Sequence, residues 1–101
     1  MKPIGKTEFY GKIDSTLLNG FVSVNEPQFK KKLLDYMQNP NFCSACTSAR
    51  VFDYFKNTET DIAMNSYEDN LYYWDDRDIY YLKEYNIEPT NEFIQHVLNQ
   101  K

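Results

Sequence analysis

Apolar residues recur every three or four positions between residues 25 and 39, which is the spacing of one face of a helix. Asn25 can cap this helix, Gln28 follows at the capping-box position, and Pro40 stops it. The apolar face would consist of Phe29, Leu33, Leu34 and Met37. The pattern therefore predicts a helix from Asn25 to the residue before Pro40.

The last third of the chain predicts two more helices. Asp75 can cap a helix over residues 76–85, with Trp74 before the cap and Ile79 after it forming a hydrophobic staple. Asn86 follows as a left-handed C-cap. Thr90 then caps a final helix, whose buried stripe would be Phe93, Ile94, Val97 and Leu98.

The remaining segments have weaker patterns. Residues 42–56 are broadly apolar, and we interpret them as a central helix. Residues 61–74 form either a short hairpin turning at 68–70 or an irregular stretch. Within residues 1–24, Asn-Gly at 19–20 favours extended structure at 21–24 over a short helix from Asp14. We therefore predict a mostly α fold: a small single domain, 1–101, of about four helices, with room for one short β-hairpin.

Composition limits the class of protein. The 101 residues are 42% hydrophobic and 17% aromatic, enough for one core, and no apolar run is long enough to cross a bilayer. With no signal-peptide pattern at the start, we expect a cytoplasmic protein without a membrane partner. Residues 1–50 hold seven Lys/Arg and four Asp/Glu, net +3, whereas residues 51–101 hold four and eleven, net −7. The acidic half should repel nucleic acid and attract a basic protein.

Catalytic and metal-binding patterns are weak in this sequence. Cys43 and Cys46 form one C-x-x-C, but a structural zinc site needs four ligands, and His96 is the only histidine. We expect both cysteines to be small apolar groups on one buried helix face and His96 to be a half-buried or surface residue. Asp75 and Asp76 suit capping better than metal binding. We predict no catalytic residue, no metal and no cofactor.

Aromatic and acidic residues concentrate in the segment LYYWDDRDIY, residues 71–80. Ile79 and Leu82 take the inward positions of the predicted helix, so Tyr80 and Tyr81 cannot both point at one core, and at least one should reach the surface. Exposed tyrosines among carboxylates would anchor and steer a basic partner. The predicted partner-binding residues are Tyr72, Tyr73, Asp75, Asp76, Asp78, Tyr80, Tyr81 and Glu84.

The same region resembles a known class of proteins. YYWDDRDIYYLKEYNIEPTNEFIQHVL, residues 72–98, is similar in acidity, aromatic content and its Trp-acidic helix start to the closing segment of small bacterial immunity proteins. These proteins guard against toxins of contact-dependent growth inhibition and other polymorphic toxin systems. The resemblance implies a cytoplasmic protein that neutralises one cognate toxin, often a nuclease, in a tight 1:1 complex.

We therefore expect a non-enzymatic inhibitor that blocks the active-site cleft of a basic toxin domain, such as a nuclease. One alternative is a phage-encoded or regulatory adaptor that mimics nucleic acid. A second alternative is a small thiol- or metal-dependent enzyme that uses Cys43, Cys46 and His96.

Overall fold

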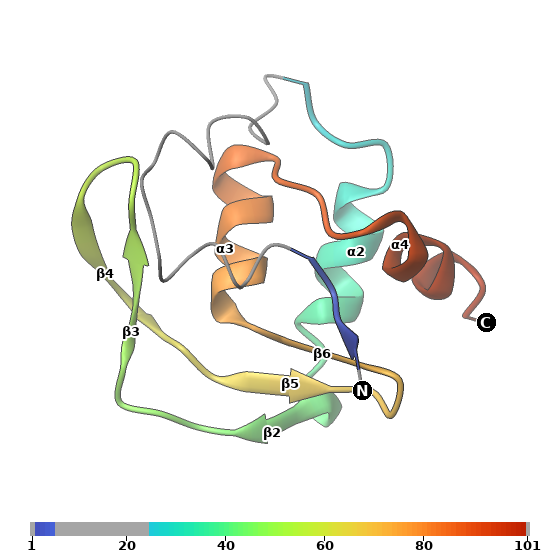
Figure 1. The fold of residues 1–101 in the computed structure, drawn as a ribbon, viewed down its shortest axis with the longest axis horizontal. Helices are drawn as coiled ribbons and strands as arrows, with labels where there is room; N and C mark the ends of the chain where they lie inside the picture. The colour runs from blue at the N-terminus through green and yellow to red at the C-terminus, as the bar shows by residue number, and fades with distance from the viewer. Residues whose placement is uncertain (1, 6–24, 101) are drawn as a thin grey trace.

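The computed structural model describes residues 2–5 and 25–100 (Figure 1). In chain order its elements are β1 (Lys2–Pro3), α2 (Lys30–Met37), the 3-10 helix η2 (Pro40–Phe42), β2 (Cys43–Ala45), β3 (Arg50–Asp53), β4 (Thr58–Ala63), β5 (Ser66–Glu68), β6 (Tyr72–Asp75), α3 (Asp76–Tyr85) and α4 (Asn91–Leu98). The expectations for residues 6–24 lie outside the described residues. No helix in the described part of the chain is long and apolar enough to cross a membrane.

The fold is α/β, so the prediction of a mostly α bundle of four helices is wrong. Six strands form two sheets in the described residues: a four-stranded sheet of order β1-β6-β5-β2 and a separate β3–β4 pair. Strand β1 pairs with β6 in parallel, and the other pairs are antiparallel. In Figure 1 the strands β2, β5 and β6 lie along the lower side of the molecule, with α2 and α3 above them.

The error arose in the segment 42–56, which forms β2 and β3 instead of a central helix. This segment holds four aromatic residues, two Cys and two Ser, with one Thr and one Val, and these types favour strands or turns over helix interiors. Along β3, Val51 and Asp53 are buried while Arg50 is exposed, so the side chains alternate with the period of a strand. In residues 42–56, apolar residues without helical spacing therefore indicated strands.

Of the two alternatives for residues 61–74, the structure has a hairpin, but over residues 66–75: its turn, 69–71, lies one residue later than the predicted 68–70, and residues 61–63 belong to β4 instead. Strands β5 and β6 pair antiparallel, with Tyr67 opposite Trp74 and Glu68 opposite Tyr73. Asn70 lies in the turn with φ 86°, a conformation that asparagine tolerates better than most residues. Alternation along β6 buries Tyr72 and Trp74 and leaves Tyr73 exposed.

Trp74 lies at the centre of the larger core. Its ring stacks on that of Tyr67 at a centroid distance of 6.2 Å and lies 5.8 Å from Phe42 and 5.4 Å from Phe93. Its Nε1 donates a hydrogen bond of 3.0 Å to the carbonyl of Met37 at the end of α2. One side chain thus joins β5, η2, α2 and α4.

The caps of α3 and α4 are as predicted. Asp75 accepts a hydrogen bond from the backbone N–H of Arg77, and a capping box with Asp78 is complete. Asn86 ends α3 in the left-handed conformation, with φ 57°. Thr90 caps α4 by accepting a hydrogen bond from the N–H of Phe93, and Phe93, Ile94 and Val97 are buried.

Helix α2 begins later than predicted. Its first residue is Lys30, and Phe29 holds the N-cap position without a side-chain cap, so the capping box expected at Asn25 does not form. The N–H of Lys30 instead bonds to the carbonyl of Pro27 in a turn. Of the predicted apolar face, Leu33 and Met37, one helical turn apart, are buried, whereas Leu34 is half-buried and Phe29 is exposed.

A second, smaller core lies on the other side of α3. It consists of Val51, Tyr80, Tyr81 and Ile87 and is separate from the core around Trp74. At its edge the carboxylate of Asp53 is fully buried and accepts hydrogen bonds of 2.5 Å from both Tyr80 Oη and Tyr85 Oη. Its other oxygen accepts from the backbone N–H groups of Phe55 and Lys56, each at 2.9 Å.

Asp53 should therefore fasten the β3–β4 pair to α3. Replacing Asp53 by Ala leaves two buried hydroxyls and two N–H groups without their acceptor, so we expect the free energy of unfolding in urea to fall by about 3 kcal/mol. As a control, Tyr85→Phe removes one donor and should cost about 1 kcal/mol. Equal, small losses for both variants would show that the carboxylate does not hold this contact.

Candidate functional site

Six of the eight predicted partner-binding residues do not present an exposed side chain. Tyr80 and Tyr81 are 9% and 0% exposed, so the expectation that one of them reaches the surface is wrong. The expectation assumed one core, but α3 packs between two, with Ile79 and Leu82 in one and both tyrosines in the other. Tyr81 Oη, moreover, donates to the carbonyl of Phe52 at 2.7 Å. Tyr72 is also buried, at 7% exposure.

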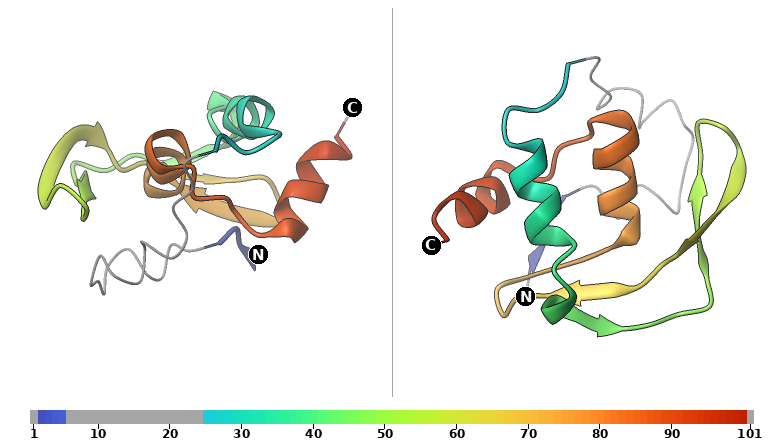
Figure 2. Two further views of the ribbon diagram at one scale, coloured as in Figure 1. Left: turned by 90° about the horizontal axis from the view of Figure 1, so that it is seen from above. Right: turned by 180° about the vertical axis from the view of Figure 1, so that it is seen from behind.

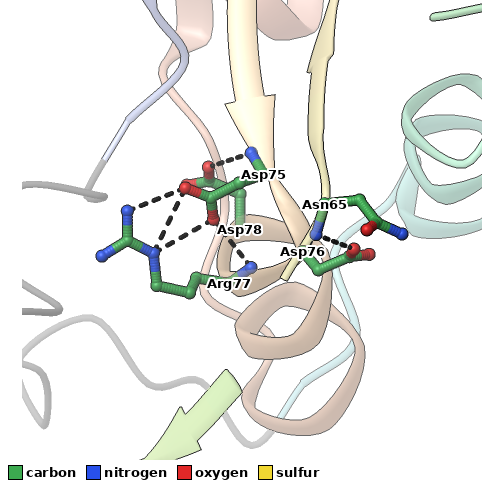
Figure 3. Close-up of polar contacts among 5 residues, drawn as sticks. All are labelled: Asn65, Asp75, Asp76, Arg77 and Asp78. Carbon is green, nitrogen blue, oxygen red and sulfur yellow. Dashed lines mark hydrogen bonds and ion pairs between the residues drawn. The ribbon is translucent and has the colours of Figure 1, made fainter. Parts of the chain in front are cut away.

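The three aspartates at the start of α3 are held by contacts inside the chain (Figure 3). Asp75 forms a forked ion pair with Arg77, whose Nη2 lies 2.8 Å from Asp75 Oδ2. Asp76 accepts a hydrogen bond of 2.8 Å from the N–H of Asn65. Asp78 is buried and accepts from the N–H of Asp75 at 3.2 Å. Asp75 and Asp78 therefore serve capping, as the helix-start pattern indicated, whereas Asp76 lies on the other side of the helix start and binds the segment before β5.

The surroundings of Asp76 disfavour its ionised form and raise its pKa. Its partial burial and the neighbouring charge of Asp75 raise its pKa, although hydrogen bonds from the Asn65 N–H and the Tyr67 hydroxyl oppose this. Burial and the Asp76 charge in turn raise the pKa of Tyr67 to about 12. Neither group is arranged as an exposed contact for a partner.

Tyr73 and Glu84 are the two predicted residues that are exposed, and they lie apart. Tyr73 is on β6 within the sheet, whereas Glu84 is in the last turn of α3, which runs away from the sheet (Figure 1). Tyr73, at 44% exposure, has the exposed Glu68 directly across the hairpin, and Leu71, at 58%, lies two residues earlier in the turn. We call Glu68, Leu71 and Tyr73 the outer face. It combines apolar surface with a carboxylate, and lies opposite the buried Tyr72 and Trp74.

The turn that carries the outer face is fixed by Asp69. Its Oδ1 accepts hydrogen bonds from the N–H groups of Leu71 and Tyr72, at 3.1 and 2.8 Å. Its Oδ2 lies 2.5 Å from Tyr36 Oη of α2 and 2.8 Å from His96 Nε2 of α4. A single carboxylate therefore holds the hairpin tip against two helices.

Sequence reasoning treated His96 as a lone histidine and missed Asp69. The two residues are 27 positions apart, and only the folding of β5–β6 against α4 brings them together. The side chains of His96 and Asp69 are 17% and 2% exposed, and Tyr36 Oη lies 3.3 Å from the same nitrogen. Both oxygens of the Asp69 carboxylate accept hydrogen bonds that hold the fold together. We therefore call Asp69, Tyr36 and His96 the Asp69 clamp and assign it a structural role.

The two cysteines are not buried on a helix, as we had expected. Cys43 begins strand β2, Cys46 directly follows it, and both thiols are free and exposed. Among the described residues no group of three or more His, Cys, Asp or Glu side chains could hold a metal ion. His96, on α4, binds Asp69 of the β5–β6 turn. Cys43, Cys46 and His96, the three residues of the thiol-enzyme alternative, therefore do not form one metal-binding group.

The Asp69 clamp should make stability depend on pH. Burial alone would raise the pKa of Asp69, but hydrogen bonds from Tyr36, His96 and two backbone N–H groups lower it. A carboxyl whose pKa is lower in the folded state than in the unfolded state stabilises the fold fully above its ordinary pKa of about 4. This stabilisation is lost as the pH falls through the lower, folded pKa. Wild type should therefore lose stability between about pH 5 and pH 2.

The matched variant is Asp69→Asn, which cannot ionise. We expect its free energy of unfolding at pH 7 to be lower by about 2 kcal/mol, with a flatter acid limb than wild type. Urea unfolding monitored by Trp74 fluorescence across this pH range measures both. An acid limb of unchanged slope in the variant would show that other carboxyls carry the dependence.

The chain matches no protein-family model, and comparison with curated proteins and with solved structures found no similar protein. The resemblance to immunity proteins is therefore untested by these comparisons and stays a prediction.

Proposed function

We propose that the protein is a non-enzymatic binding protein that neutralises a basic partner, as an immunity protein neutralises a toxin domain. The observation that carries this proposal is the outer face: Leu71 and Tyr73 expose apolar and aromatic surface beside the carboxylate of Glu68. Tyrosine anchors are enriched at binding hot spots, and a neighbouring carboxylate favours a cationic groove. The binding surface thus moves from helix α3, where we first expected it, to the hairpin.

The distribution of charge supports a basic partner. In the acidic half of the chain six carboxylates are exposed: Glu59, Asp61, Glu68, Glu84, Glu88 and Glu92. Within residues 51–100, which the structure describes, the exposed basic residues are Lys56 and Lys83, so the field around this half is negative. Such a field speeds encounter with a positive surface and repels the phosphate backbone of nucleic acid.

Rigidity of the hairpin supports the same use. Because Asp69 ties the turn to α2 and α4, Leu71 and Tyr73 are held in place before a partner arrives. Pre-organised side chains lose little conformational freedom on binding, which favours affinity. We propose a 1:1 complex formed in the cytoplasm, in which the outer face enters the active-site cleft of a basic toxin, with a nuclease as the first candidate.

The test first identifies the partner by co-purification of the tagged full chain from its native host and mass spectrometry, and then measures binding of that partner by surface plasmon resonance and growth protection on co-expression. Tyr73→Ala should weaken binding by about 2 kcal/mol, which is roughly a 30-fold increase in Kd. Ile62→Ala is the matched control, since Ile62 is 42% exposed on β4, and it should change Kd less than 2-fold, about 0.4 kcal/mol.

Charge reversal tests the electrostatic part separately. Glu68→Lys should slow association about 10-fold at low salt and reduce its salt dependence, whereas Glu59→Lys on β4 should act much more weakly. If both tyrosine and glutamate variants protect cells as wild type does, the outer face is not the binding surface. Tight binding of a basic protein that is no toxin would instead favour the adaptor alternative.

A further inference from the structure

We propose that Cys43 and Cys46 form a reversible dithiol–disulfide site at the open edge of the sheet. Strand β2 is the last strand in the order β1-β6-β5-β2, and both cysteines are exposed there. The site is independent of the proposed binding function, because neither residue belongs to the outer face.

In a regular strand these two residues could not meet. Side chains alternate across the sheet, so residues i and i+3 point to opposite faces and their Cα atoms are about 10 Å apart. A disulfide requires Cα atoms closer than about 7 Å and side chains that face each other. The spacing C-x-x-C on a strand would therefore exclude a bond between the two sulfurs.

A bulge in β2 changes this geometry. Cys43 pairs with Tyr67 and Ala45 pairs with Ser66, so two steps along β2 correspond to one step along β5. Ser44 is the extra residue, and an extra residue offsets the alternation by one. Cys43 shares the face of Tyr67, Ala45 lies on the opposite face, and Cys46 returns to the face of Cys43.

The thiols are accordingly neighbours. The Cys46 thiol contributes to raising the pKa of Cys43, as expected of two thiols on one face of the strand. The segment after Cys46 is held in place by a hydrogen bond from the N–H of Thr47 to Asn65 Oδ1 at 3.4 Å and by one from the N–H of Ala49 to Thr47 Oγ1 at 3.1 Å. The segment that follows the bulge is thus held by hydrogen bonds in the folded chain.

Two cysteines suffice for a disulfide, whereas a structural zinc site needs four ligands. Partial desolvation, the Cys46 thiol and the charge of Asp76 raise the pKa of Cys43. A protonated thiol gains no thiolate stabilisation in the reduced state, so the equilibrium should favour the disulfide, although the smaller thiolate fraction slows its formation.

The reaction is thiol–disulfide exchange with a small disulfide such as glutathione disulfide. One cysteine thiolate attacks the disulfide, forming a mixed disulfide and releasing one glutathione thiolate, which takes up a proton. The second cysteine thiolate then attacks the protein sulfur of the mixed disulfide and releases the second glutathione. The protein loses two electrons and two protons, and the glutathione disulfide gains them.

The test treats the reduced full chain with glutathione disulfide, quenches it with acid and measures the intact mass and the free thiols. Wild type should remain a monomer, lose the mass of two hydrogens, and fall from two titratable thiols to none; dithiothreitol should restore both. Cys43→Ser and Cys46→Ser should instead each stop at a stable adduct with one glutathione.

A second probe does not depend on oxidation. Phenylarsine oxide bridges two thiols that lie close together, so it should bind wild type and resist displacement by monothiols, but not bind either single variant in this way. Circular dichroism of the double Cys→Ser variant checks that the fold is kept. Wild type that stops at the glutathione adduct, forms disulfide-linked dimers or keeps both thiols free would overturn the proposal.

Discussion

The strand-to-helix junction at residues 71–76 is the constraint on which the rest of the structure depends. Because side chains alternate along β6, Tyr72 and Trp74 enter the core, while Tyr73 stays outside. The next residue, Asp75, is both the last residue of β6 and the N-cap of α3, so the end of the strand and the start of the helix are fixed together. Trp74 then joins the hairpin to both flanking helices through ring contacts and the bond to the Met37 carbonyl. Sheet, helices and outer face are set by this one register.

Some of the acidic residues hold the fold together instead of contributing to the negative surface. Asp53 and Asp69 each accept four hydrogen bonds: Asp53 holds the β3–β4 pair against α3, and Asp69 holds the β5–β6 hairpin against α2 and α4. A carboxylate can accept several donors at once, which suits it to gather N–H and O–H groups from separate elements. The negative field therefore arises from other residues, the exposed glutamates and Asp61, and the two sets can be altered separately.

Local signals in the sequence predicted most of the local structure, with the capping box at Asn25 as the exception. The Asp75 and Thr90 caps, the Asn86 C-cap and the turn of the β5–β6 hairpin each depend on residues within a few positions, and all are present. The strands in 42–56 were missed because their partners come later in the chain. The burial of Tyr80 and Tyr81 was missed for a similar reason: β3 supplies a second core beside α3, and no pattern within the helix reveals it. The clamps at Asp53 and Asp69 join residues at least 27 positions apart, beyond any spacing rule.

Hydroxyl-radical footprinting of the free protein, analysed by mass spectrometry residue by residue, tests the β6–α3 register most directly. Exposure to radicals should label Leu71 and Tyr73 heavily and leave Tyr72, Trp74, Tyr80 and Tyr81 protected, in keeping with their burial. Labelling of Tyr80 or Tyr81 at the rate of Tyr73 would contradict this register and return the exposed aromatic surface to α3.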